Sequence, residues 1–223
     1  MSTLERLWPL FGLRLRTERL ELRVPTDEDL AELAVVAAAG VHPPEQMPFS
    51  TPWTDLPPGE LERGVLQWHW GLRASWSPDD WHADFAVILE GRVVGAQGIA
   101  AKQFAIARGV DTGSWLGQPF QGQGIGKEMR AAVLALAFDG LGALEARSGA
   151  VAGNLASARV SRSLGYRDNG HAIHVVRDQR TVEHHFVMDR DRWAARRRPP
   201  VEIVGLEACR SLFRSDAPPS PPL

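Results

Sequence analysis

The segment Gln121–Lys127 (QGQGIGK) carries the strongest chemical signal in the sequence, because three glycines alternate with other residues there. An apolar run that ends at Trp115-Leu116 comes before it, and a helix-like stretch follows it. Glycine permits a tight turn and lets a ligand approach the backbone closely. The first amides of a helix have no partner inside the helix and favour an anion. The segment therefore predicts a site for a phosphate-bearing ligand.

Two widespread phosphate-binding patterns do not fit this segment. A Walker A loop needs glycine where Gln121 stands and Ser or Thr where Glu128 stands. A Rossmann fingerprint that starts at Gly122 needs its third glycine at position 127, which is Lys. The pattern that does fit is Gln/Arg-x-x-Gly-x-Gly/Ala, with Gln121, Gly124 and Gly126 in place.

The elements expected to position this turn alternate between strands and helices. Apolar periodicity and helix caps predict strands near 13–23, 84–89, 92–100, 107–116, 144–151, 173–177 and 181–188, and helices near 27–39, 58–73, 127–139 and 154–164. On the second of these helices, Leu61, Val65, Trp68 and Leu72 form one apolar stripe. This mixed order predicts an α/β protein whose sheet carries helices on both faces.

A long loop, residues 41–56, separates the first two predicted helices. Four prolines exclude a helix there. The loop is apolar for its length, and the residues expected to line a substrate pocket are His42, Met47, Phe49 and Trp53. Such a loop either covers a binding site or packs on the core for stability alone.

Four motifs in order resemble the GNAT acyltransferases, in particular the ribosomal-protein-acetyltransferase-like branch. They are TERLELR in 17–23, TGSWLG in 112–117, the glycine turn, and NLASARVSRSLGY in 154–166. The resemblance covers about residues 13–193. It implies a central mixed sheet of six to seven strands with helices on both faces, and acyl-coenzyme A as cosubstrate without a metal.

A narrower resemblance joins the chain to an actinobacterial subgroup that includes a mycobacterial succinyltransferase. It rests on VHPPEQMPFSTPWT, on DTGSWLGQPFQGQGIGKEMRAAVLALAF, on GYRDNG and on the C-terminal VEIVGLEACRSLF. This resemblance adds succinyl-CoA to acetyl-CoA as a donor candidate.

The resemblance also implies roles for single residues. Asn154 would reach the pantetheine arm, although asparagine is equally suited to cap a helix. Ser157 would protonate or solvate the departing thiolate, or else bond its own backbone. A backbone amide at Trp115 or Leu116 would polarise the thioester carbonyl. The pyrophosphate would lie on Gln121, Gly122, Gln123, Gly124, Ile125, Gly126 and Lys127.

The chain departs from the family pattern at the position of the general acid. Many members place a tyrosine seven residues after the asparagine, where this sequence has Ser161, and its one tyrosine, Tyr166, stands in a packing corner. Ser157 or a water must then serve as the acid. The base candidates are Asp111, His42, Glu45 and Asp55, and proximity alone is the alternative.

Composition excludes several other classes of protein. Lys plus Arg (25) nearly balances Asp plus Glu (27), which argues against a nucleic-acid surface. The single cysteine, Cys209, allows no internal disulfide and lies outside the matched core, which disfavours a cysteine shuttle. The seven histidines show no metal-ligand spacing. No signal peptide or membrane span is recognisable, so we expect a cytoplasmic protein.

These observations predict an acyl-CoA-dependent N-acyltransferase domain over residues 1–195. A C-terminal extension, 196–214, would pack on or extend the sheet, and a proline-rich tail, 215–223, would be disordered. The acceptor would be a small-molecule or peptide amine, and an edge strand at 201–206 could pair across a homo-oligomer. The alternative is a non-catalytic acyl-CoA-binding sensor or assembly module; a nucleotide-phosphate enzyme is disfavoured by the failed loop patterns.

Overall fold

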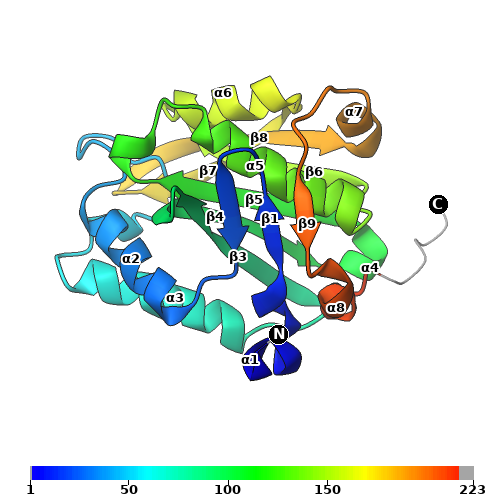
Figure 1. Cartoon of the computed structure of the whole chain (residues 1–223). Helices are drawn as coiled ribbons and strands as arrows, with labels where there is room; N and C mark the ends of the chain where they lie inside the picture. Colours follow the sequence, from blue (N-terminus) through cyan, green and yellow to red (C-terminus); the bar gives the residue numbers. More distant parts are fainter. Residues whose placement is uncertain (1, 216–223) are drawn as a thin grey trace.

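Nine strands form one mixed sheet in the computed structural model, which describes residues 2–215 (Figure 1). Their order across the sheet is β7-β8-β6-β5-β4-β3-β2-β1-β9. The strands are β1 Arg14–Arg16, β2 Leu20–Arg23, β3 Asp80–Leu89, β4 Arg92–Lys102, β5 Gly109–Leu116, β6 Glu145–Val151, β7 Arg167–Val176, β8 Gln179–Asp189 and β9 Glu202–Val204.

The α/β architecture agrees with the prediction, but the expected six to seven strands are too few. The stretch predicted as one strand near 13–23 folds into β1 and β2, which pair antiparallel around a turn closed by Thr17 N–H donating to the Leu20 carbonyl. Strand β9 then adds to the outer side of β1. The turn residues looked like a break within one strand, and pairing between distant segments leaves no local signal.

Helices cover both faces of the sheet (Figure 1). Their bounds are α1 Thr3–Leu7, α2 Asp27–Ala38, α3 Glu60–Ala74, α4 Phe104–Ala107, α5 Ile125–Ala135, α6 Leu155–Leu164, α7 Arg190–Ala194 and α8 Leu206–Cys209. The Thr26 hydroxyl caps α2 by accepting from the Asp29 amide, as its sequence predicts. Helices α1, α4 and α7 are too short to show periodicity and were not predicted.

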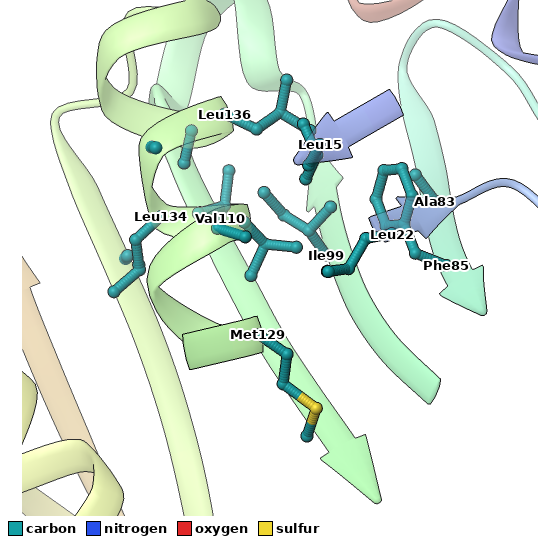
Figure 2. Close-up of a cluster of buried hydrophobic side chains, with 14 of the residues drawn as sticks. Leu15, Leu22, Ala83, Phe85, Ile99, Val110, Met129, Leu134 and Leu136 are labelled. Carbon is teal, nitrogen blue, oxygen red and sulfur yellow. The ribbon is translucent and has the colours of Figure 1, made fainter. Parts of the chain in front are cut away.

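Strand β3 shows how the two faces are built, because its neighbouring residues alternate between two buried clusters. Phe85 and Val87 join the larger cluster, in which Figure 2 shows Phe85 together with Met129 and Leu134 of α5. Ala86 and Ile88 face the other way, into the cluster under α2 and α3.

The buried stripe of α3 differs from the predicted one at its third position. Trp68 is 56% exposed, whereas His69 is 4% exposed. Leu61, Val65 and His69 are spaced four residues apart, which keeps them on one face of the helix. Burial lowers the pKa of His69, partly opposed by Asp84, so this imidazole is neutral at pH 7.

The crossover β5–α5–β6 creates the feature that matters for function. Among the strand pairs of residues 2–215, β5 with β6 is the parallel one, and its pairing ends at Thr112 opposite Ser148. Strand β5 continues to Leu116 and β6 to Val151, so the sheet opens into a fork there. Ligands of open α/β sheets bind beyond the carboxyl ends of such strands.

The C-terminal segment closes the opposite end of the sheet. Beyond β9, Phe213 packs edge-on against Trp76 and Trp81. Cys209 is buried, and burial raises the pKa of its thiol to about 11, so it stays protonated at neutral pH. The expected disordered tail lies outside the described residues, except for Ser215.

Candidate active site

The fork between β5 and β6 is lined by glycine on the face that carries α2 and α3. Gly113 and Gly149 directly follow the last paired residues, Thr112 and Ser148. A side chain on Gly113 would meet open space, since no atom lies within 4 Å of an added Cβ. The backbone of β5 is therefore accessible where it separates from β6.

The glycine turn lies past the carboxyl end of β5. Gly122 and Gly124 have φ values of 73° and 79°, a left-handed conformation that glycine adopts without strain. Within the described chain, none of the backbone amides of residues 122–126 donates a hydrogen bond. Consecutive unpaired amides at a helix start form a concave anion-binding site.

Most side chains of this turn are hydrogen-bonded or buried within the protein. Gln121 Nε2 donates to the carbonyls of Val41 (2.7 Å) and Leu116 (2.8 Å), and so ties the turn to the long loop. Gln123 Nε2 donates to the Pro119 carbonyl, and Ile125 is buried in the core. The backbone, with Lys127 exposed beside it, therefore presents the anion site.

An arginine from the β1–β2 turn lies beside the same amides. Arg19 Nη1 donates to the Gln123 carbonyl (3.2 Å), and its Nη2 would lie 3.6 Å from a Cβ on Gly124. Its Nε donates to Glu128 Oε2, and Thr17 Oγ1 donates to Glu128 Oε1. Burial raises the pKa of Glu128, but these hydrogen bonds outweigh it and lower the pKa overall.

Arg19 has no predicted role, although it lies within the TERL motif. Its position beside the turn depends on the packing of the β1–β2 turn against α5, and spacing along the chain does not reveal that contact.

Helix α6 begins at the open end of the fork, as α5 does. Asn154 caps it: Oδ1 accepts from the Ser157 amide (3.1 Å), while Nδ2 donates to the Pro48 carbonyl (3.4 Å). The capping role is therefore real, and the same side chain holds the long loop. Ser157 is partly buried in the first turn of α6.

The long loop packs its aromatic residues against β5. The rings of His42, Phe49, Trp53 and Trp115 follow one another, with centroid separations of 5.8, 5.3 and 5.6 Å. Met47 is partly buried on the same loop. Since Trp115 belongs to β5, the structure connects three of the four predicted pocket residues to this strand, Trp53 directly and Phe49 and His42 in turn behind it.

An ion pair fastens this loop to the β7–β8 hairpin. Arg177 forms a bidentate ion pair with Asp55, and its Nη1 donates to the Pro44 carbonyl. The hydrogen bond from Arg177 lowers the pKa of Asp55. The loop is thus held at the glycine turn, at α6 and at this hairpin.

The carboxylates predicted as bases are engaged elsewhere. Both oxygens of Asp111 accept from Arg147, at 3.0 and 3.1 Å, on the exposed surface. Asp55 is held by Arg177. His42 Nε2 lies 2.7 Å from Thr54 Oγ1, and Glu45 is exposed on the loop.

A buried polar cluster lies under the fork, on the α5 side of the sheet. Arg130 is buried and donates to Ser148 Oγ (2.7 Å) and Ser114 Oγ (3.0 Å). Arg130 Nε donates to the Gln97 amide oxygen (3.4 Å), so the hydrogen-bond acceptors of this guanidinium among the described residues are neutral groups. The Tyr166 hydroxyl lies 3.4 Å from Thr112 Oγ1, and burial raises its pKa.

Ser161 stands where many family members carry the acid tyrosine. It is fully buried, and its hydroxyl has no hydrogen-bond partner among the described residues. It therefore faces the protein interior and does not replace that tyrosine.

Neither a metal-binding group nor a membrane-spanning helix is found in the described part of the chain. No group of three or more His, Cys, Asp or Glu side chains is placed to hold a metal ion. Within residues 2–215, no helix combines the length and apolar character that crossing a membrane requires.

A family comparison now identifies the class of protein. Residues 19–167 match the model of the acetyltransferase (GNAT) domain, which is more than half of the chain. The chain therefore belongs to the GNAT acetyltransferase family.

Solved structures agree on the fold. A GCN5-related N-acetyltransferase from Brucella melitensis is 21% identical with a TM-score of 0.64, covering 82% of this chain and 80% of that one. A GNAT-family acetyltransferase from Bacillus anthracis is 16% identical with a TM-score of 0.60, covering 80% and 99%. The ribosomal-protein alpha-N-acetyltransferase RimL, solved with coenzyme A, is 17% identical with a TM-score of 0.61, covering 79% and 97%.

Proposed function

We propose that the protein is an N-acyltransferase that moves an acetyl or succinyl group from acyl-CoA to a primary amine. The observation that carries this proposal is the row of unpaired amides at residues 122–126, next to an open fork in the sheet. The amides suit the pyrophosphate, and the fork offers free strand edges to an extended pantetheine arm. Membership of an acetyltransferase family supports the same ligand.

The reaction needs a neutral amine to attack the thioester carbonyl in a ternary complex. The new C–N bond forms, the C–S bond breaks, and the thiolate takes a proton. We infer that Ser157 supplies or relays that proton, because Asn154 orients the start of its helix at the open end of the fork. A backbone amide near Trp115 or Leu116 would polarise the carbonyl. Holding both reactants in place contributes much of the rate.

The identity of the acyl group is a second part of the proposal. Arg130 is a buried cation whose protein partners are neutral hydroxyl and amide groups under the fork. An unpaired buried charge is costly, and a carboxylate on the acyl group would offset that cost. This supports succinyl-CoA as a donor beside acetyl-CoA.

The acceptor is proposed to be a small-molecule or peptide amine that enters beneath the aromatic loop. His42, Met47, Phe49 and Trp53 would line its path, next to Trp115. Pairing of β9 across a homo-oligomer stays a prediction, as does a cytoplasmic location.

A non-catalytic acyl-CoA sensor is the second candidate, and one observation favours it. Ser161 replaces the usual acid tyrosine, and its hydroxyl is turned into the interior. Binding of acyl-CoA without turnover on any amine would support this function.

The test is thiol release from acetyl-CoA and succinyl-CoA in the presence of a panel of peptides, diamines and aminoglycosides. The enzyme predicts release that depends on both protein and amine, with an acylated amine of the expected mass. Binding of the donors without amine-dependent release would leave the sensor, and absence of binding would refute both.

A further inference from the structure

Glu183 on β8 carries its carboxylate over the fork. It lies opposite Val151 of β6, so its side chain is on the face that also bears Gly149. A methyl group on Gly149 would collide with Glu183 Oε1, which shows that this oxygen lies directly above the glycine. Gly149 is the first residue of β6 past the last β5–β6 pair.

The other side of the opening is unobstructed. Gly113 occupies the corresponding place on β5, with open space above it. Glu183 Oε1 therefore borders a gap between two strands whose floor is bare backbone. In the proposed reaction, the amine must reach the thioester carbon through this gap.

The two oxygens of Glu183 differ in their surroundings. Oε2 lies 2.8 Å from His174 Nε2 and 3.6 Å from His185 Nε2. Oε1 accepts no hydrogen bond from any side chain or amide that the structure describes. One oxygen is thus anchored, while the other is available to a ligand at the fork.

The partners of Glu183 also distinguish it from the carboxylates considered first. Asp111 and Asp55 each face an arginine, and both oxygens of each carboxylate accept hydrogen bonds from that guanidinium. Glu183 has only imidazoles within ion-pair distance among the described residues. Imidazole exchanges protons near neutral pH, and partly exposed His174 offers a path from the carboxylate to solvent.

We propose that Glu183 is the general base of the acyl transfer, and this inference rests on the function proposed above. Its Oε1 binds the ammonium group of the acceptor and takes one proton, leaving a neutral amine. The amine then forms the C–N bond as the C–S bond breaks. The proton on Glu183 passes through His174 to solvent, and a second proton from the amine nitrogen ends on the thiol of coenzyme A.

The titratable groups on this face are known for each neighbouring strand. They are Arg167 and His174 on β7, His185 and Asp189 on β8, Glu145 and Arg147 on β6, and Asp111 on β5. Arg147 is bonded to Asp111 and Glu145, which leaves the imidazoles as the direct neighbours of Glu183.

The test compares Glu183→Gln with wild type, using an amine that the wild type acylates. General bases contribute about 10²–10⁴-fold, so kcat/KM for the amine should fall by at least about 10²-fold near pH 7. The affinity for coenzyme A should stay unchanged. The deficit should shrink as pH approaches the pKa of the amine, because the amine is then already neutral.

Two further variants keep the result interpretable. Glu145→Gln removes a carboxylate from the same face of β6, at the paired end of the strand, and should leave kcat/KM unchanged. Glu183→Asp keeps the charge and the fold but shortens the side chain, and should retain part of the activity with the wild-type shape of the pH profile.

The proposal is overturned if Glu183→Gln retains activity within about threefold of wild type with an unchanged pH profile. It is also overturned if Asp111→Asn, and not Glu183→Gln, removes the acidic limb of the pH profile of kcat/KM. Failure of the proposed function looks different: the wild type itself then transfers no acyl group to any amine, whatever its affinity for acyl-CoA.

Discussion

Replacing Arg19 with alanine should weaken acyl-CoA binding by about 5–30-fold without disturbing the fold. The substitution removes a cation whose Nη2 would lie 3.6 Å from a Cβ on Gly124. It also leaves the Glu128 carboxylate, in the first turn of α5, without its guanidinium partner. Both changes make the turn less favourable for a pyrophosphate.

The size of the effect follows from exposure. Two unit charges about 4 Å apart interact by about 1 kcal/mol in water and about 4 kcal/mol at an effective dielectric constant of 20. The Arg19 side chain is 44% exposed, which places it near the water limit. We therefore expect a loss of about 1–2 kcal/mol at low salt, with less at high salt because the charges are screened.

The assay is isothermal titration of coenzyme A at low and high ionic strength. Arg16→Ala is the matched control, since Arg16 lies on the same hairpin and forms ion pairs with Glu21 of β2 and Glu202 of β9 instead of with the glycine turn. Combining Arg19→Ala with Glu128→Gln should recover part of the affinity. Equal binding by Arg19→Ala and wild type at low salt would refute the reasoning.

Three other predictions concern stability and the loop. Ser161→Ala should raise the free energy of unfolding by about 1 kcal/mol and the melting temperature by about 2–4 °C, because it removes a buried, unpartnered hydroxyl. The control Ser163→Ala, on the exposed side of α6, should change both quantities less. Destabilisation by Ser161→Ala would contradict the claim that its hydroxyl lacks a partner. Arg177→Ala should raise the rate at which the 41–56 loop is cleaved in limited proteolysis, by a few-fold at most because the Arg177–Asp55 ion pair is exposed. An unchanged cleavage rate would refute the claim that this ion pair holds the loop. Because burial lowers the pKa of His69 below its usual value of about 6.5, the unfolded chain binds the proton first, so stability should fall as pH drops below that value. Denaturant unfolding from pH 7 to 5 should show a shallower decline in His69→Gln, and identical slopes would contradict the assignment.

Local signals predicted the longer elements well. Thr26 and Asn154 start α2 and α6 as their capping propensities indicate, and Gly165 ends α6. The hairpin of β3 and β4 follows from two apolar runs around a Glu-Gly turn. The extra strands, the short helices and the exposed position of Trp68 depend on packing between distant segments, which single-sequence patterns do not encode.

Part of the candidate site could likewise be predicted from the sequence, and part of it could not. The glycine turn was predictable because its function is carried by consecutive backbone amides. Arg19 and Glu183 were not, because each reaches the site only through the order of strands in the sheet. Arg130 lies within the predicted helix near 127–139, and the pattern of that helix does not show that its side chain enters a polar cluster under the fork. A base sought among residues close to the motifs therefore pointed to Asp111, which is engaged with Arg147.

The most direct test of the central claim is calorimetric titration of coenzyme A, acetyl-CoA and succinyl-CoA into wild type, Gly122→Trp and Gly142→Trp. The two glycines form a matched pair, with φ values of 73° and 76° and open space beside each. One lies in the turn before α5, and the other lies past the far end of that helix. We predict one-site binding to wild type and Gly142→Trp, with loss in Gly122→Trp. Equal binding by both folded variants, or no binding to folded wild type, would contradict the claim that acyl-CoA is held at the glycine turn.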